Sequence, residues 1–375
     1  MVGEESPLRV LMIVTSMQRG GMETFTMNVY RAMDRTKVQF DFLLHRDFKG
    51  DYDDEIERMG GRLYRIRRQN PLDPRYWHAL DSFFAEHHYD VVHAQLDCLS
   101  AEPLAVAERH GAVVRVAHSH NSDQDKDLKY PIKMLCKPFI ARYATHLFAC
   151  GERAGSWMFG HNDFTVIKNC IDVGSYAFDA DMREAARGML GIGRETLVVG
   201  HVGRFNEVKN HAFILEVFAA LLSRRPGSRL LLVGDGPLRE EIECRASALG
   251  IRRSVDFLGV RPDIPSLMQA MDCFLMPSLY EGLPMVLVEA QASGLPCLIS
   301  DAIPEDCDIA PNLVERVALS ESPESWSSRI ERLAAEPNDR AAGARDVAEA
   351  GFDAKGVAAQ LQDFYLSAKA GASDE

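Results

Sequence analysis

Short runs of apolar residues alternate with longer stretches in which apolar positions recur every three or four residues. The runs predict buried strands, and the recurring positions predict amphipathic helices. In the stretch 23–33, for example, Phe25, Val29, Tyr30 and Met33 fall on one helical face. We predict strands at 9–15, 40–44, 62–66, 91–94, 113–117, 146–149 and 165–167, and then at 197–202, 229–233, 255–258, 273–276, 296–299 and 316–319. This alternation of strand and helix predicts two doubly wound parallel α/β sheets.

A chain of 375 residues fits two domains of ordinary size. We place the boundary in the segment 168–175, after the last strand of the first half. Helical spacing of apolar residues predicts a further helix at 355–368, beyond the second sheet.

The bulk composition limits the possible partners and compartments. A formal net charge of −13 argues against nucleic-acid binding, which needs a basic surface. The eight cysteines form no CxxC pair, so we interpret them as free core thiols in a reducing cytosol. No signal peptide and no apolar run of membrane-spanning length is visible. We therefore expect a cytoplasmic protein, with peripheral contact at the inner membrane face left open.

The sequence YEGLPMVLVEA, from Tyr280 to Ala290, contains two acids eight positions apart. Glu281 precedes an apolar helical run, Pro284 suits its first turn, and Glu289 lies within it. A carboxylate in such a helix fits a polyhydroxylated ligand, and a helix N-terminus favours phosphate. A solvated Glu289 on an amphipathic helix explains the pattern equally well.

The segment GRFNEVKNH follows a predicted strand, where parallel sheets bind their ligands. Arg204 and Lys209 emerge there together, and their charges suit a diphosphate. Two surface cations without function are the alternative. Gly20 and Gly21, in SMQRGGMET, likewise join a strand to a helix and permit close backbone approach or positive φ. They lack the spacing of a dinucleotide-binding fingerprint and could form a plain turn.

His118 and His120 end the fifth predicted strand in AHSHN, beside Asn121. Their place at a strand end favours a ligand site over a purely structural role, but which ring points inward is left open. Asp-x-Asp pairs can hold a divalent cation against a diphosphate. We interpret all of those in this acidic chain as solvated loop acids, and expect no metal and no other cofactor: Asp51 and Asp53, Asp123 and Asp125, Asp179 and Asp181, Asp306 and Asp308.

The stretch 128–146 has apolar residues at helical spacing and a stripe of lysines, Lys129, Lys133 and Lys137. A basic amphipathic surface on an acidic protein predicts contact with anionic lipid at the inner membrane face. Pro131 and Pro138 require a kink or break. An ordinary helix packed on the core is the alternative.

Taken together, SMQRGGMET, AHSHN, FACGE, HVGRFNEVKNH, LLLVGDGP, VDFLGV and YEGLPMVLVEA resemble glycosyltransferase family 4, retaining enzymes with the GT-B fold. The exopolysaccharide and capsule subgroup is the most similar. The resemblance implies two Rossmann-like domains facing across a cleft, with 1–170 on the acceptor side and 175–350 binding the nucleotide-sugar donor. It implies that the helix at 355–368 packs back on the first domain. The linker KNCID departs from the family's usual P-N-G-I-D.

The resemblance also implies roles for the candidate residues. Arg204, Lys209 and the Gly21 backbone are expected at the donor diphosphate, and Glu289 at the ribose. The transferred sugar is expected to contact side chains and backbone amides of His118, Glu281, Gly282, Leu283 and Met285. Of these, His118 and Glu281 are expected to be catalytic. Acceptor-side contacts are expected at Gly20, His120 and Asn121.

We therefore expect a retaining glycosyltransferase that moves a sugar from a UDP-sugar, or alternatively a GDP-sugar, to a hydroxyl of a lipid-linked glycan. Rival hypotheses are another GT-B enzyme, such as a nucleotide-sugar epimerase or a phosphorylase, and a sugar-binding subunit without activity. An epimerase needs no acceptor, and a phosphorylase releases sugar phosphate, so product analysis separates them.

Overall fold

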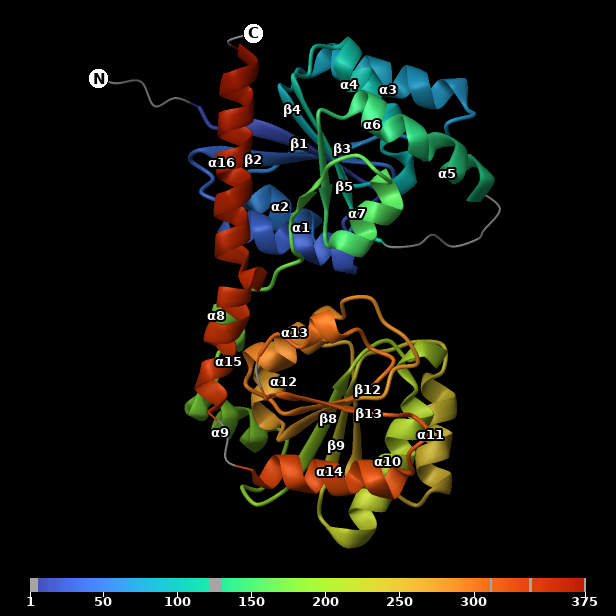
Figure 1. Ribbon diagram of the computed structural model, residues 1–375, viewed down its shortest axis with the longest axis vertical. Coiled ribbons are helices and arrows are strands. Elements are labelled where there is room, and N and C mark those ends of the chain that lie inside the picture. The colour runs from blue at the N-terminus through green and yellow to red at the C-terminus, as the bar shows by residue number, and fades with distance from the viewer. Residues whose placement is uncertain (1–5, 122–129, 311, 337–338, 374–375) are drawn as a thin grey trace, which may run out of the picture. The chain divides into compact units, whose positions relative to one another are not determined.

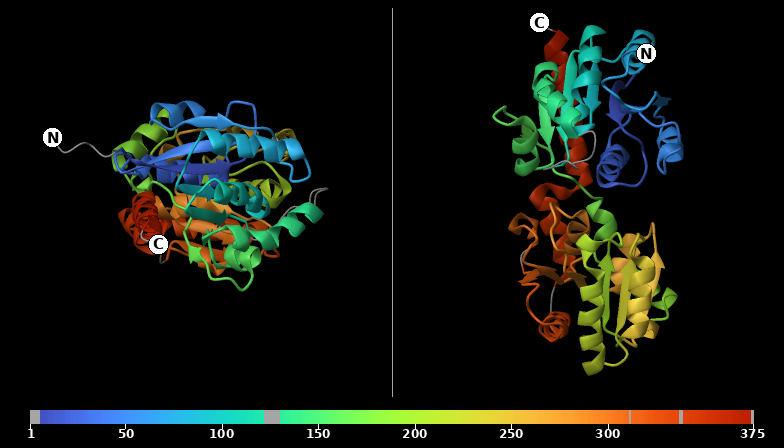
Figure 2. Two further views of the ribbon diagram at one scale, coloured as in Figure 1. Left: turned by 90° about the horizontal axis from the view of Figure 1, so that it is seen from above. Right: turned by 90° about the vertical axis from the view of Figure 1, so that its right-hand side faces the viewer.

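A computed structural model describes residues 6–121, 130–310, 312–336 and 339–373. The chain divides into two compact units. The first consists of Met1–Cys170 together with Ala354–Glu375, and the second of Ile171–Asp353. Each unit is a parallel sheet with helices on both faces (Figures 1 and 2).

The first unit contains a seven-stranded sheet in the order β3-β2-β1-β4-β5-β6-β7, and every pair in it is parallel. Alternate residues of its central strand pack on opposite faces, so both faces are buried. The strands are β1 (Leu8–Val14), β2 (Val38–Leu44), β3 (Leu63–Arg65), β4 (Val91–Ala94), β5 (Val114–Ser119), β6 (His146–Ala149) and β7 (Thr165–Val166).

One face of this sheet carries α1 (Gly21–Ala32), α2 (Asp53–Arg58) and the C-terminal helix α16 (Ala354–Ser373). In Figure 1, α16 lies beside α1 and β2, and Val357, Leu361 and Tyr365 enter this core. The other face carries α3 (Pro74–Glu86), α4 (Ala101–Arg109), α6 (Ile140–Tyr143) and α7 (Glu152–Phe159).

The second unit contains a six-stranded parallel sheet in the order β10-β9-β8-β11-β12-β13. Its strands are β8 (Val198–Val202), β9 (Arg229–Val233), β10 (Val255–Gly259), β11 (Cys273–Met276), β12 (Cys297–Ser300) and β13 (Val314–Val317). One face is covered by α10 (His211–Arg224), α11 (Arg239–Ala248) and α14 (Pro323–Ala335). Packed on the other face are α12 (Ile264–Ala270) and α13 (Met285–Ala292), and this unit also contains α8 (Val173–Tyr176), α9 (Ala180–Met189) and α15 (Arg340–Val347).

Strand order reverses direction between β1 and β4 in the first unit and between β8 and β11 in the second. Connections that leave two adjacent strands toward opposite faces open a crevice beyond the carboxyl ends of those strands. The loops after β1 and β4, and those after β8 and β11, are therefore where each unit is built to bind a ligand.

The doubly wound α/β fold is confirmed, and most predicted strands match within one or two residues. The last strand begins at Val314, two residues earlier than predicted. Residues 128 and 129 lie outside the described residues. The rest of the stretch 128–146 is no single helix but α5 (Tyr130–Cys136), a 3-10 turn η2 (Lys137–Phe139) and α6.

Two predictions about the bulk of the chain need comment. Cys244 is exposed on α11, so the reading of the cysteines as core thiols is wrong for that residue. Across the described residues, no helix combines the length and apolar character needed to cross a bilayer.

Candidate functional site

In the second unit, the chain leaves β8 through a tight turn that places both predicted cations. Arg204 is exposed and its guanidinium has no hydrogen bond or ion pair with the described residues. The 3-10 turn η3 (Glu207–Lys209) follows, and the Asn206 side chain accepts a hydrogen bond from the Lys209 amide at 3.2 Å. The turn therefore holds Lys209 back toward the strand ends.

Three contacts join this turn to the loop after β11. The amide of Leu279 donates to the Val208 carbonyl at 2.8 Å, and the Asn210 side chain donates to the Pro277 carbonyl at 3.2 Å. Asn210 has a φ of 53°, in the left-handed region that asparagine tolerates better than most residues. The two loops at the switch point thus form one structure.

The third contact is an ion pair between Lys209 Nζ and Glu281 Oε1, at 2.5 Å. Both side chains are mostly enclosed, with 16% and 13% of their surface exposed. Sequence reasoning gave Lys209 and Glu281 separate ligand contacts, and the structure brings them together as a pair at the switch point. A diphosphate that approaches Lys209 would therefore compete with, or share, the Glu281 carboxylate.

Glu289 lies just after the first turn of α13, which begins directly after Pro284. Removal from water raises the pKa of its carboxyl from 4.5 to about 7, and a hydrogen bond with Tyr176 lessens the rise. Glu289 is half-buried and in contact with Tyr176, so it is not a fully solvated acid on the helix surface. Gly282 is exposed, while Leu283 and Met285 are half-buried at the start of the helix.

Two glycines that sequence reasoning did not assign support the turn after β8. The Gly203 amide donates to the Val233 carbonyl at 2.9 Å, and a side chain at Gly234, whose φ is +133°, would collide with the Gly203 carbonyl. A side chain at Gly236 would collide with the Phe205 backbone. The VGDGP motif could have signalled this close approach, because paired glycines after a strand mark backbone contact.

In the first unit, a chain of hydrogen bonds runs from the C-terminal helix to the end of β5. The Tyr365 hydroxyl contacts His93 Nδ1 at 2.6 Å, and His93 Nε2 contacts His118 Nδ1 at 3.2 Å. His118 Nε2 is buried and has no partner among the described residues. All three side chains are at most 1% exposed.

The direction of this chain follows from counting donors and acceptors. If the Tyr365 hydroxyl donates to His93, then His93 Nε2 carries a hydrogen and donates to His118, which leaves His118 Nε2–H as a donor. The reverse order would strand the buried Tyr365 hydrogen without an acceptor. Burial lowers the pKa of His93 to about 3 and that of His118 well below 6.5, so both rings are neutral at pH 7.

His120 lies on the same side of the strand as His118, because residues two apart share a face. The two rings stack with centroids 4.2 Å apart, and His120 contacts Gln95 at 2.9 Å and Asn169 at 3.2 Å. Asn121 donates to the Asp97 carboxylate at 2.7 Å, on the loop after β4. Of the two histidines, only His118 therefore has a ring nitrogen left for a further partner.

Gly20 and Gly21 are exposed at the N-terminus of α1, after β1. Neither adopts a positive φ, so the glycines are not explained by a left-handed backbone. Nothing lies within 4 Å of a side chain built at Gly21, whereas one at Gly20 would collide with the Glu23 carboxyl. Gly21 thus leaves open space at the switch point of this sheet.

The Asp-x-Asp pairs serve local structure where they are described. Asp53 is buried, accepts from the Gly50 amide at 2.8 Å and pairs with Arg65, so reading it as a solvated loop acid is wrong. Asp179 caps α9, and Asp308 pairs with Arg316. Asp123 and Asp125 lie outside the described residues. Within the described ranges, no three His, Cys, Asp or Glu side chains gather as metal ligands.

Comparisons with known proteins fit this geometry. The family model described as Glycosyltransferase Family 4 matches residues 19–175, and that described as Glycosyl transferases group 1 matches residues 182–347. EpsF of Bacillus subtilis (strain 168), provisionally named as a glycosyltransferase, is 40% identical over 373 residues, which cover 96% of this chain and 97% of EpsF. The chain belongs to glycosyltransferase family 4.

Solved structures agree on the fold of this family 4 member. The crystal structure of Anabaena Alr3699/HepE in complex with UDP has a TM-score of 0.78 at 21% identity, covering 96% of this chain and 100% of that one. Among relatives by sequence, a galactosyltransferase of Escherichia coli, whose name contains UDP-Gal and GlcNAc-diphosphoundecaprenol, is 32% identical over 146 residues, which are 38% of each chain. The protein is thus a glycosyltransferase with the GT-B fold, an enzyme of the hexosyltransferase type.

Proposed function

We propose that the protein is a retaining glycosyltransferase that uses a nucleoside diphosphate sugar, with uridine favoured over guanosine. The Lys209–Glu281 pair carries this proposal, because it sets a cation and a sugar-binding type of carboxylate together at the switch point of the second sheet. Among similar proteins, HepE has been crystallised with UDP and with UDP-glucose, and the Escherichia coli relative is named for UDP-Gal.

In the proposed reaction, the bond between the sugar C1 and the β-phosphate oxygen breaks, and the nucleoside diphosphate leaves with the electron pair. Arg204, Lys209 and the first amides of α13 stabilise the charge that develops on this leaving group. The acceptor oxygen bonds to C1 from the same face, and its proton passes to the departing phosphate oxygen. No metal is needed, since the protein supplies the compensating charge.

Glu289 is proposed to bind the ribose hydroxyls. Its carboxyl costs free energy to ionise in the unliganded protein, as its raised pKa indicates. Two hydroxyl donors would favour the ionised form, so nucleotide binding should release a proton near pH 7. Glu281 and His118 are proposed to contact the transferred sugar, with Gly282, Leu283 and Met285 beside it and Gly21 near the diphosphate.

The acceptor is proposed to be a lipid-linked glycan in exopolysaccharide or capsule synthesis, handled by the first unit near Gly20, His120 and Asn121 at the cytoplasmic face of the membrane. The Escherichia coli galactosyltransferase supports a lipid-linked acceptor by its name alone, which contains GlcNAc-diphosphoundecaprenol.

The proposal is tested by incubating the protein with a panel of UDP- and GDP-sugars, with and without a lipid-linked acceptor. Acceptor-dependent release of UDP, and a product whose anomeric configuration matches that of the donor, are expected. Product with inverted configuration, conversion of the donor without acceptor, or release of sugar phosphate would each contradict it.

A further inference from the structure

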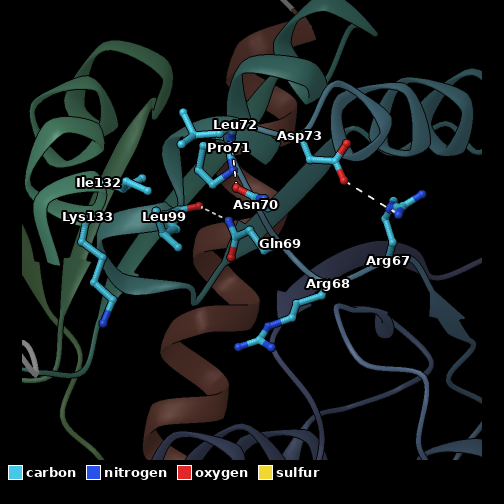
Figure 3. Close-up of a pocket in the computed structure, with 10 residues that line it drawn as sticks. All are labelled: Arg67, Arg68, Gln69, Asn70, Pro71, Leu72, Asp73, Leu99, Ile132 and Lys133. Carbon is cyan, nitrogen blue, oxygen red and sulfur yellow. Dashed lines mark hydrogen bonds and ion pairs between the residues drawn. The ribbon is translucent and has the colours of Figure 1, made fainter. Parts of the chain in front are cut away.

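A cavity of about 510 Å³ in the first unit has no part in the donor chemistry described above. It lies beyond the carboxyl end of β3, against α5 and the 3-10 turn η1 (Asp97–Leu99) that follows β4. Its size falls in the range of small-molecule sites. Figure 3 shows the residues that line the cavity. Arg68 and Lys133 lie on opposite walls, and their side chains extend toward the same side of the cavity.

Cations gather around this cavity in an otherwise acidic chain. It is lined by Arg67, Arg68 and Lys133. The Arg67 guanidinium forms a long ion pair with the Asp73 carboxylate, at 3.8 Å. Arg46, on the loop after β2, lies close enough to Arg68 that burial and this like charge lower the pKa of Arg46. Among the described residues, Arg68 has no ion pair and Arg67 has only the long one with Asp73, so these two guanidiniums favour an anion of more than one charge.

The wall of the cavity is rigidly built. Gln69 is buried and donates to the Leu99 carbonyl at 2.6 Å, and the Trp77 indole donates to the Pro71 carbonyl at 2.9 Å. The loop that carries Arg67 and Arg68 is thus fixed to η1 on one side and to α3 on the other. Such a loop loses little conformational freedom when a ligand binds.

An apolar groove of about 480 Å³ adjoins the cavity and shares Pro71 with it. Trp77, Phe139 and Tyr143 line the groove, together with Cys136. Glu102 and Glu108 also border it, which disfavours a phosphate there. Two large apolar side chains at these sites are exposed, Leu72 of the cavity at 70% and Phe139 of the groove at 51%, and Leu135 of α5 is exposed at 68%.

We propose that this cavity binds the diphosphate of a polyisoprenyl diphosphate-linked acceptor, and that the adjoining groove receives the first isoprene units. The inference deepens the proposed function and rests on its lipid-linked acceptor. It also gives residues 130–143 a specific role in place of a general membrane-facing stripe. Lys133 lines the cavity, whereas Lys137 lies over the Trp157 ring at 4.1 Å.

The test uses farnesyl diphosphate as the probe, titrated into the full-length protein by calorimetry while UDP saturates the donor site. Saturation with UDP prevents the probe's diphosphate from occupying the site at Arg204 and Lys209. Wild-type protein should bind the probe at least about tenfold more tightly than it binds either farnesol or inorganic pyrophosphate, because each lacks one half of the recognition. Equal binding of pyrophosphate and probe would overturn the assignment of the groove.

The double variant R67A/R68A should lose at least about tenfold in affinity for farnesyl diphosphate. Both side chains are exposed, so folding should persist, as circular dichroism will verify. The matched control is R35A/K37A, which removes two cations at the opposite, amino-terminal end of β2 and should change nothing. Unchanged affinity in R67A/R68A, or equal loss in both double variants, would overturn the proposal.

The single variant F139S separates the two halves of the site. It should weaken the farnesyl diphosphate complex and leave pyrophosphate binding as it is, since Phe139 borders only the groove. UDP affinity and donor turnover, measured on the same proteins, distinguish the two levels of inference. Failure of wild-type donor turnover contradicts the proposed function, whereas intact turnover without a probe effect contradicts only this cavity assignment.

Discussion

In the second unit, Lys209 and Glu281 meet as a charged pair that keeps some access to solvent. In the first unit, neutral histidines lie at the carboxyl ends of β4 and β5, with His118 connected through His93 to Tyr365. The charged pair lies on loops beyond its strands, whereas His93 and His118 lie in the last residues of β4 and β5. The first group carries charge, and the second makes only hydrogen bonds. In the proposed function, the cation of the charged pair stabilises the leaving group, while the histidines contact uncharged hydroxyls of the sugar and the acceptor.

The largest expected effect comes from removing the charge. Lys209→Ala should lower kcat by about 10²–10³-fold, because one stabilising contact to the developing phosphate charge is lost. Steady-state release of UDP measures this. Lys49→Ala, an exposed lysine paired with Asp54, is the control and should retain wild-type turnover. Full activity in Lys209→Ala would remove the charged half of the comparison.

A smaller loss is expected from breaking the hydrogen-bond chain at its far end. Tyr365→Phe removes the donor to His93, so His118 should no longer be confined to its Nε2–H form, and kcat should fall by about tenfold for one lost polar contact. Nitrogen-15 NMR of the His118 ring reports the tautomer directly. A merely structural role would lower the melting temperature without changing that spectrum, and such a result would remove Tyr365 as a positioning residue.

The third test concerns pH. Because the folded protein holds the Glu289 proton more tightly than the unfolded chain does, this group's contribution to stability is complete below about pH 4.5 and falls as the pH rises through about 7. Glu289→Gln should therefore be more stable than wild type at pH 8, by up to about 3 kcal/mol, and similar at pH 4. Urea unfolding at both pH values measures the difference.

The same variant should bind UDP more weakly and release no proton on binding, as calorimetry in buffers of different ionisation enthalpy will show. A variant no more stable than wild type at pH 8 would mean that Glu289 ionises freely in the unliganded protein.

The smallest expected effect is that of a chelator. If Arg204 and Lys209 supply all the positive charge that the diphosphate needs, EDTA should leave the rate of UDP release unchanged. The measurement compares initial rates with EDTA and with added Mg²⁺. A loss of turnover that Mg²⁺ restores would show that the cations of the second unit are insufficient.

The sequence was most informative where local pattern and burial coincide. Buried parallel strands are continuous apolar runs, and β4, β6, β9 and β11 were predicted with their observed bounds. Edge strands were less certain, because only part of each is buried, and β13 was placed too late. The motif residues Lys209 and Glu281 were assigned to one donor site through the family resemblance. The structure brings them together because their loops follow β8 and β11, which are neighbours in the sheet.

Other features depend on contacts that no local pattern contains. Tyr365 contacts His93, which lies 272 positions away in the sequence. Tyr176, which lies on a different helix from Glu289, makes a hydrogen bond with the Glu289 carboxyl. The proline-containing stretch after residue 130 has the period of one helix, but its geometry breaks at η2, because proline cannot donate within a helix. Its side chains consequently line cavities that periodicity alone does not reveal.

The position of α16 has a consequence for how the protein is made. The chain leaves the first unit at Cys170. That unit is complete only when Ala354 and the residues after it have returned to it. During translation, the early sheet must therefore wait, with His93 lacking its hydroxyl partner and one apolar flank uncovered, until the last helix leaves the ribosome. A stop codon at position 354 would thus leave the first unit incomplete even though every residue of the second had been made.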